Sequence, residues 1–194
     1  MMFDKHEQAL FWRRQCRLCK YCLILLLAML PLQLFAASAS IEYKLKAALI
    51  YKLSKFVEWP KTTETDRPLS FDICVLGTDY FGPSLDALEE KTITGLPIKI
   101  RRFSQSVSID SHCRVLFISK SKQAFLPAII KKLPTRAVLT LGDSTGFAEQ
   151  GGMIQFTYVD KRIGFKINLD RAKGAELKIA APLLELATIV KSPG

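Results

Sequence analysis

Short apolar segments alternate with segments of helical composition along most of the chain, and this alternation constrains the fold more than any other feature of the sequence. Strands are predicted at residues 69–76, 98–103, 114–118 and 137–141. Helical composition lies between them, at residues 81–88 and 121–133. Hydrophobicity is continuous in most of these strands, whereas a strand with one solvated face would alternate. The pattern therefore predicts an α/β fold with a mostly parallel sheet, flanked by helices on both faces.

Towards the C-terminus the pattern changes to strict alternation. Ile154, Phe156 and Tyr158 alternate with polar residues, and apolar residues alternate again over 163–167, after a turn at Asp160 and Lys161. Two alternating segments joined by a short turn predict an antiparallel β-hairpin, which we place at the edge of the sheet. No internal repeat and no linker divides the chain, so we expect a single domain.

Helices are also expected at both ends of this pattern. Residues 41–57 have helical periodicity, and their predicted buried face is Leu45, Leu49, Leu53 and Phe56. Pro60 ends that helix, because proline also restricts the residue before it. Pro182 suits the first turn of a last helix, whose predicted buried side is Leu183, Leu186, Ala187 and Val190.

The first 39 residues have the three parts of a secretory signal peptide. A basic cluster over residues 13–20 precedes an uncharged, mostly apolar run over 21–35, and small residues follow. The sequence Ala37-Ser38-Ala39 fits the cleavage rule, which predicts removal of residues 1–39 between Ala39 and Ser40. The apolar run of about 15 residues is shorter than the roughly 20 that cross a bilayer, so an uncleaved anchor is disfavoured. We expect an exported domain over residues 40–194 that does not insert into the membrane.

The charge of this exported domain does not favour nucleic acid as a partner. The whole chain has 28 Lys and Arg against 18 Asp and Glu, and residues 1–39 hold five of the basic and two of the acidic ones. The remainder has a net charge of about +7, spread among acidic residues without a basic stripe. A mildly basic exterior near an anionic membrane surface is the simpler interpretation.

Cysteine usage follows from the same cleavage. Cys16, Cys19 and Cys22 lie in the segment that is removed, which leaves Cys74 and Cys113. In an oxidising compartment disulfides persist, so we expect these two to pair. A structural bond is the favoured interpretation, and a redox switch requires that the bond be exposed or strained.

No group of residues predicts catalysis, a metal or a cofactor. The exported part has one histidine, His112, and no serine lies in a Gly-x-Ser-x-Gly turn. The turn Gly77-Thr78-Asp79 follows the first predicted strand of the sheet, where parallel sheets tend to bind ligands. A small-molecule site at this turn is one hypothesis, and a purely structural strand-to-helix turn is the other.

Several segments resemble, in order, the YfiR family of periplasmic proteins. The resemblance is carried by residues 42–60, 73–77, 112–118, 138–141, 146–154, 163–169 and 183–187. It implies an α/β periplasmic domain without known catalytic activity. The best-understood members repress an inner-membrane diguanylate cyclase by binding its periplasmic sensor domain, which limits cyclic di-GMP, exopolysaccharide and biofilm formation. Members tend to form homodimers, and the oxidation of their cysteines is tied to stability and repression.

One departure from the family bears on redox control. Some relatives have a second cysteine pair near the segment that matches residues 151–158, and this chain has none there. Any redox effect implied by the resemblance therefore depends on Cys74 and Cys113 alone.

Two functions are compatible with this resemblance. The first is a regulator that represses a diguanylate cyclase, with a contact surface on the hairpin and last helix at Phe165, Ile167, Leu184 and Glu185. This placement follows because an exposed sheet edge can dock another chain, and the alternative is that these residues simply cover the core. The second is a periplasmic subunit that senses a small molecule near the turn at 77–79 and serves a sensor kinase or an outer-membrane receptor.

Overall fold

The computed structural model shows a fold that begins at Tyr43. The chain divides into a unit of residues 1–42 and a unit of residues 43–194. The structure describes residues 41–60, 68–105, 112–133, 137–159 and 162–191. The predicted signal peptide and its cleavage site at Ala39 and Ser40 lie outside the described residues, as does the predicted hairpin turn at Asp160 and Lys161.

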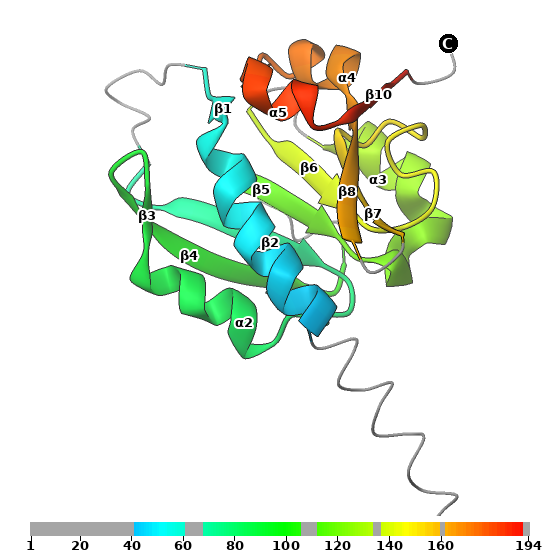
Figure 1. Cartoon of the computed structure of the whole chain (residues 1–194). Coiled ribbons are helices and arrows are strands. Elements are labelled where there is room, and N and C mark those ends of the chain that lie inside the picture. The colour runs from blue at the N-terminus through cyan, green and yellow to red at the C-terminus, as the bar shows by residue number, and fades with distance from the viewer. Residues whose placement is uncertain (1–40, 61–67, 106–111, 134–136, 160–161, 192–194) are drawn as a thin grey trace, which may run out of the picture. The chain divides into compact units, whose positions relative to one another are not determined.

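An eight-stranded sheet forms the centre of the second unit, in the order β10-β8-β7-β6-β5-β2-β4-β3 (Figure 1). Its strands are β2 (Phe71–Leu76), β3 (Thr92–Ile93), β4 (Leu96–Phe103), β5 (Cys113–Ile118), β6 (Leu139–Gly142), β7 (Ile154–Val159), β8 (Arg162–Asn168) and β10 (Thr188–Val190). All pairings are parallel except the β7–β8 hairpin and the β3–β4 pair. The prediction of a mostly parallel α/β sheet with a C-terminal antiparallel hairpin is confirmed.

Helices cover both faces of this sheet. The N-terminal helix (residues 41–55) crosses one face together with α2 (Pro83–Asp86) and its 3-10 continuation Ala87–Glu90 (Figure 1). The opposite face packs against α3 (Leu126–Lys132), which follows the 3-10 helix Lys120–Phe125. Short elements complete the fold, namely α4 (Leu169–Gly174), α5 (Ala181–Glu185) and a separate antiparallel pair of β1 (Val57–Glu58) and β9 (Lys178–Ile179).

Strand β2 shows why its hydrophobicity is continuous. Successive side chains of a strand point to opposite faces, and every residue of β2 is buried. Ile73 and Val75 belong to the apolar cluster under the N-terminal helix. Cys74 and Leu76 belong to the cluster under α3. Both faces of this strand are therefore core.

The buried face of the N-terminal helix differs from the predicted one. Its buried side chains include Tyr43, Lys46, Ala47, Ile50 and Leu53, whereas the predicted Leu45 and Phe56 are exposed and Leu49 is only partly buried. Phe56 lies beyond the last helical residue, so it does not continue the helical stripe. Tyr43 and Lys46, two residues with polar ends, lie on the inner side of the helix, and Leu45 therefore lies on the outer side.

The last predicted helix is also shorter than expected. It ends at Glu185, and after a turn at Leu186 and Ala187 the chain forms β10, which pairs in parallel with Lys166–Asn168 of β8. Of the four residues predicted to be buried, only Leu183 is, and Leu186 is 75% exposed. The run Thr188-Ile189-Val190 is β-branched and favours a strand once an open sheet edge lies beside it. Strand β10 is therefore the edge strand of the sheet, and the β7–β8 hairpin lies next to it, paired through residues 166–168 of β8.

A buried ion pair fixes the N-terminal helix to the carboxyl end of β6. Lys46 Nζ lies 2.7 Å from Asp143 Oδ2, and the two side chains are only 3% and 4% exposed. Tyr43 donates its hydroxyl to the same oxygen at 2.6 Å, and the Lys46 ammonium lies over the Tyr43 ring. Charges removed from water require this kind of pairing, so the helix orientation depends on Asp143.

Replacing Asp143 with Ala should strongly destabilise the fold. The variant leaves the Lys46 ammonium buried without its carboxylate, and we expect the free energy of unfolding to fall by about 3 kcal/mol. Urea unfolding followed by circular dichroism measures the change. The control is Glu58→Ala, which removes the exposed partner of Lys178 and should change the free energy by less than about 0.5 kcal/mol. Similar losses in the two variants would contradict the assigned role of Asp143.

Candidate functional site

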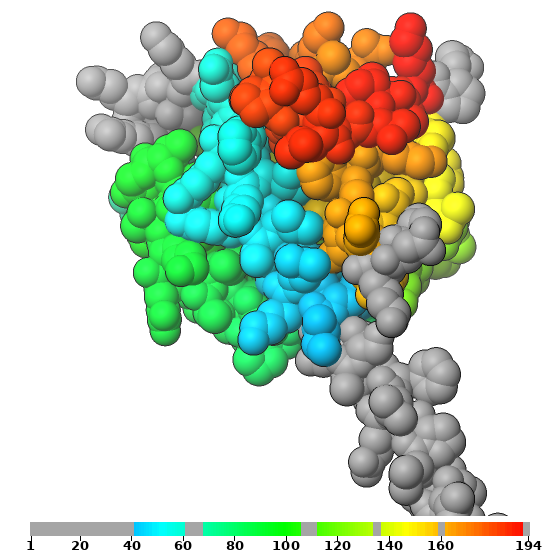
Figure 2. Space-filling model, in the orientation of Figure 1, coloured from blue at the N-terminus to red at the C-terminus, as the bar shows by residue number. Residues whose placement is uncertain are grey.

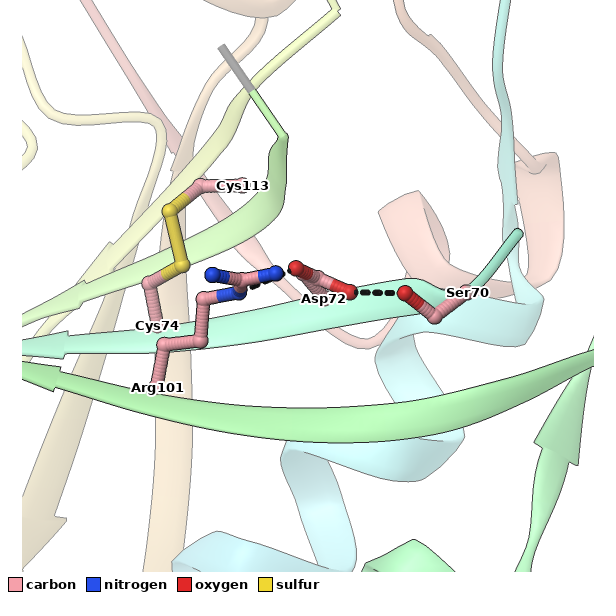
Figure 3. Close-up of a disulfide and its surroundings, with 5 residues drawn as sticks. All are labelled: Ser70, Asp72, Cys74, Arg101 and Cys113. Atoms are coloured by element: carbon pink, nitrogen blue, oxygen red, sulfur yellow. Dashed lines mark hydrogen bonds and ion pairs between the residues drawn. A yellow bond between two sulfur atoms is a disulfide. The ribbon is translucent and has the colours of Figure 1, made fainter. Parts of the chain in front are cut away.

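Cys74 and Cys113 form a disulfide between two central strands (Figure 3). Cys74 lies in β2 and Cys113 begins β5, with 5.8 Å between their Cα atoms. The register of β5 against β2 shifts between Asp72 and Ile73, as in a β-bulge. As a result Cys113 joins Cys74 in the cluster under α3, whereas Val115 belongs to the opposite cluster.

The surroundings of this disulfide are closed to solvent. Both cysteines are fully buried. Beside them, the buried carboxylate of Asp72 pairs with Arg101 Nε of β4 and accepts a hydrogen bond from the Ser70 hydroxyl (Figure 3). Thiol–disulfide exchange requires access of an attacking thiolate to a sulfur atom, and burial removes that access in the folded protein. The geometry favours the structural interpretation of this bond over a redox switch.

The turn at Gly77, Thr78 and Asp79 is filled by its own chain. Gly77 has a φ of 98°, and a Cβ placed there would lie 2.5 Å from Ser121 Oγ. The same hydroxyl accepts a hydrogen bond from the Thr78 amide at 2.9 Å. Glycine is therefore required at 77 both for its backbone conformation and for the close approach of the segment after β5.

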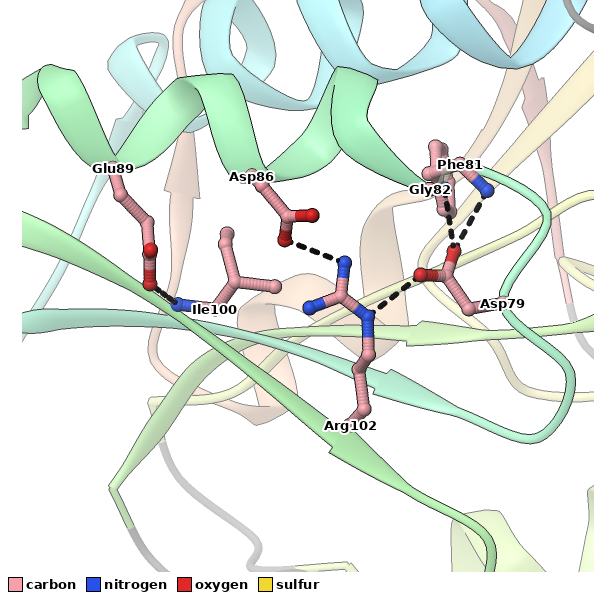
Figure 4. Close-up of polar contacts among 7 residues, drawn as sticks. All are labelled: Asp79, Phe81, Gly82, Asp86, Glu89, Ile100 and Arg102. Carbon is pink, nitrogen blue, oxygen red and sulfur yellow. Dashed lines mark hydrogen bonds and ion pairs between the residues drawn. The ribbon is translucent and has the colours of Figure 1, made fainter.

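Asp79 is likewise occupied. Its Oδ1 accepts the Phe81 amide at 2.7 Å, and its Oδ2 pairs with Arg102 Nε at 2.6 Å (Figure 4). Arg102 also reaches Asp86 at 2.7 Å. Desolvation lowers the pKa of Arg102, but its hydrogen bonds with the two carboxylates outweigh that effect and raise the pKa above its ordinary value. Both carboxylate oxygens of Asp79 are thus bonded within the protein, one to the Phe81 amide and one to Arg102. This favours a structural role for the turn over a ligand site.

The predicted contact residues fall at different depths. Ile167 is fully buried in the core, so its side chain is not available to a partner. Phe165 and Leu184 are partly buried at the border of the same core, and Glu185 is exposed. The alternation predicted the hairpin, but it did not show that Ile167 lies fully within the core or that β10 would pair with β8 beside it.

Exposed apolar side chains nevertheless gather beside these residues. Leu186 is 75% and Ile189 is 47% exposed, and Ile189 pairs in register with Ile167. We call Phe165, Leu184, Leu186, Ala187 and Ile189 the C-terminal surface. Figure 2 shows the C-terminal segment in red directly beside β8 in orange. Strand β10 is the last strand of the sheet, so its outer edge can pair with another chain.

A charged pair lies on β8, where side-chain alternation turns Lys166 to the face opposite Phe165 and Ile167. Lys166 Nζ lies 2.6 Å from Glu149 Oε1, and both side chains are about one-third exposed. The hydrogen bond from Lys166 lowers the pKa of Glu149 below its usual value, so this carboxylate stays ionised near neutral pH. The charged residue adjoining the C-terminal surface is the exposed Glu185, and charged residues at the edge of an apolar area are common in protein interfaces.

Among the described residues, no three His, Cys, Asp or Glu side chains gather as a metal site would require. No helix within the described ranges has the length and hydrophobicity needed to cross a bilayer.

Sequence reasoning missed the group formed by Tyr43, Lys46 and Asp143. Tyr43 and Lys46 share a helix face with Ala47 and Ile50, so their spacing contained a signal. A lysine in an apolar stripe is normally placed at the boundary with water, and its partner lies 97 residues away in the sequence. Only the tertiary structure brings the two charges together.

Comparison with known proteins identifies one family. A family model described as YfiR/HmsC-like matches residues 43–188. No curated protein matches the chain. One solved structure that matches is the ABC domain in complex with L-Trp from Streptococcus pneumonia, with 13% identity, a TM-score of 0.47, and coverage of 62% of this chain and 55% of that chain. The chain thus spans little more than half of that structure, and so low a score defines neither a shared fold nor a shared function.

Removing the disulfide should destabilise the protein without changing its fold. The bond joins residues 39 apart, and closing such a loop stabilises by about 4 kcal/mol through the entropy of the unfolded chain. We expect the Cys74→Ala/Cys113→Ala variant to melt at a lower temperature than the wild type in non-reducing buffer. Heating exposes the buried bond as the protein unfolds, so dithiothreitol present during melting should reduce it and lower the melting temperature of the wild type. Dithiothreitol should not change the melting temperature of the variant, which has no bond to reduce. Equal melting of wild type and variant would show that the bond contributes nothing.

Proposed function

Because the chain belongs to the YfiR/HmsC-like family, we propose that it is a periplasmic regulatory protein that represses an inner-membrane diguanylate cyclase. In this proposal it binds the periplasmic sensor domain of the cyclase, so that cyclic di-GMP, exopolysaccharide and biofilm formation stay low. It acts by binding and not by catalysis. Its signal peptide is removed between Ala39 and Ser40, and the exported domain works as a homodimer.

The observation that carries the proposal is the extent of the family match. It begins at the first residue of the folded unit and ends at Thr188, the first residue of β10, so it includes strands β2 to β8 and all of the C-terminal surface except Ile189. The Cys74–Cys113 disulfide supports an oxidising compartment, since such bonds rarely persist in the cytosol.

Repression then follows from a difference in affinity between two states of the cyclase. A bound regulator shifts an equilibrium only if it binds the inactive state more tightly than the active state. A tenfold difference corresponds to about 1.4 kcal/mol, which a few well-placed contacts can supply. A release signal would have to reduce that difference or remove the regulator.

We place the contact with the cyclase on the C-terminal surface. Leu186 and Ile189 are exposed apolar side chains on a short helix end and an edge strand, and Phe165 and Leu184 extend the apolar area beneath them. Glu185 lies at its exposed rim. Apolar anchors surrounded by charged rim residues are the usual source of binding energy in protein interfaces.

The first test is the level of cyclic di-GMP in a strain that lacks the gene. We expect the level to rise and to return to normal when the gene is supplied on a plasmid, because the repressor is then restored. Unchanged cyclic di-GMP would contradict repression of a cyclase and favour the alternative, a small-molecule-sensing subunit for a sensor kinase or an outer-membrane receptor.

The second test uses the same strain with surface variants. A Leu186→Glu gene should fail to restore low cyclic di-GMP, since burying a carboxylate at the interface should weaken binding about tenfold or more. The control is Leu69→Glu, which alters a side chain that is 91% exposed but lies outside the C-terminal surface, and which should restore it fully. Comparable amounts of both variants in the periplasm must be shown by immunoblot. Full restoration by Leu186→Glu would exclude this contact surface.

A further inference from the structure

A second recognition feature lies at the amino ends of strands β2 and β5, on a part of the fold that the C-terminal surface does not include. There the end of the N-terminal helix, β1 and the β3–β4 turn enclose a cavity of about 600 Å³. Its walls include the aromatic rings of Trp59 and Phe71 and the side chains of Leu96 and Arg114. Cavities of this size that combine apolar and aromatic side chains with polar groups are typical of small-molecule sites.

Arg114 is the unusual member of this wall. It follows Cys113 at the start of β5, and its side chain is partly buried. Burial lowers the pKa of Arg114, and no acidic residue of the described chain pairs with it. Arg101 and Arg102 differ in this respect, because Arg101 pairs with Asp72 and Arg102 with Asp79 and Asp86. A cation that loses water without gaining a counter-ion costs stability unless a ligand supplies the missing charge.

Trp59 contributes a second unmatched group. Its ring packs edge-on against Phe71, with 5.3 Å between the ring centroids. Its indole nitrogen is buried and has no hydrogen-bond partner among the described residues. Buried indole N–H groups normally find an acceptor. Trp59 thus contributes an aromatic ring to the cavity wall, while its N–H is buried away from solvent, and the Arg114 guanidinium is the donor that a ligand in the cavity can reach.

The remaining charges at the cavity favour an anion. Lys55 lies at its rim, with its ammonium 4.4 Å from the centre of the Tyr51 ring. The acidic lining residue Glu58 is exposed and has Lys178 nearby, at 3.8 Å. The lining residues thus include two cations, Lys55 and Arg114, and one carboxylate, Glu58, which has Lys178 beside it. A guanidinium suits a carboxylate in particular, because its planar N–H groups match the two oxygens.

We propose that this cavity binds a small organic carboxylate with an apolar body, whose carboxylate pairs with the Arg114 guanidinium and whose apolar part packs against Trp59, Phe71 and Leu96. The site is distinct from the surface that we assign to the cyclase, and its existence does not depend on repression of a cyclase. The competing explanation is that Arg114 only covers the aromatic core with its methylene groups while its charge faces water.

The protein contains its own probe for this site. The chain has two tryptophans, and Trp12 lies in the predicted signal peptide, so the purified exported domain (residues 40–194) has Trp59 as its only tryptophan. Its fluorescence then reports directly on the cavity wall. Phenylacetate and phenylacetamide are suitable ligands for titration, because they share an apolar ring and differ in charge. We expect phenylacetate to change the fluorescence saturably and phenylacetamide to bind about tenfold more weakly or not at all.

Variants at two cations separate a specific pair from a general charge effect. Arg114→Gln should weaken phenylacetate binding about tenfold, whereas Arg114→Lys, which keeps a charge, should retain a preference for phenylacetate over the amide. Lys55→Gln removes one positive charge from the same rim and should weaken binding less than about threefold. Thermal melting of each variant confirms that it is folded, and Arg114→Gln should melt no lower than the wild type, because no ion pair of the described chain is lost.

Three results would overturn the proposal. Equal binding of the two ligands would show that Arg114 does not recognise the carboxylate. No fluorescence change with either ligand up to about 10 mM would show that the cavity is not a site for this class of molecule. Unchanged phenylacetate binding by Arg114→Gln would favour the covering role of that side chain.

Discussion

The burial of strand β2 on both faces is the constraint on which the rest of the structure depends. Its odd-numbered side chains face the N-terminal helix and its even-numbered ones face α3, so the sheet needs a helix layer on each side. The Cys74–Cys113 disulfide then joins β2 to β5 covalently within the cluster under α3. The two sites that we propose for recognition lie outside this buried centre, one at the edge of the sheet along β8 and β10 and the other at the amino ends of β2 and β5.

The parts of the fold that follow from local pattern were predictable from the sequence, and the parts that depend on distant partners were not. Continuous hydrophobicity of β2 and β5 and alternation in β7 and β8 reveal an α/β sheet with a hairpin, because side-chain period reports which faces are buried. The inner face of the N-terminal helix depends on Asp143, which no local pattern connects to Lys46. The apolar residues 183–190 fit helical spacing, but β10 gains backbone pairing that only the neighbouring β8 provides.

The candidate sites show the same division. The exported domain has two cysteines, and this count was enough to predict that they pair. The alternating pattern of the hairpin was enough to place a contact surface near what the structure shows as the C-terminal surface. The depth of Ile167 and the exposure of Leu186 could not be read from the sequence, because both depend on where β10 lies. No local pattern in the sequence distinguishes Arg114, which follows Cys113, from the other arginines. Only the absence of an acidic neighbour within the described chain distinguishes it from the paired Arg101 and Arg102.

The central claim is that the C-terminal surface contacts a diguanylate cyclase, and site-specific photocrosslinking in living cells tests it most directly. A photoreactive amino acid is placed at Leu186, or at Leu69 as a control that lies outside that surface and is even more exposed. The account predicts that Leu186, and not Leu69, crosslinks to a membrane-bound diguanylate cyclase, identified by mass spectrometry through peptides of its periplasmic domain. Crosslinking of the cyclase from Leu69 but not from Leu186, or from neither position, would contradict it.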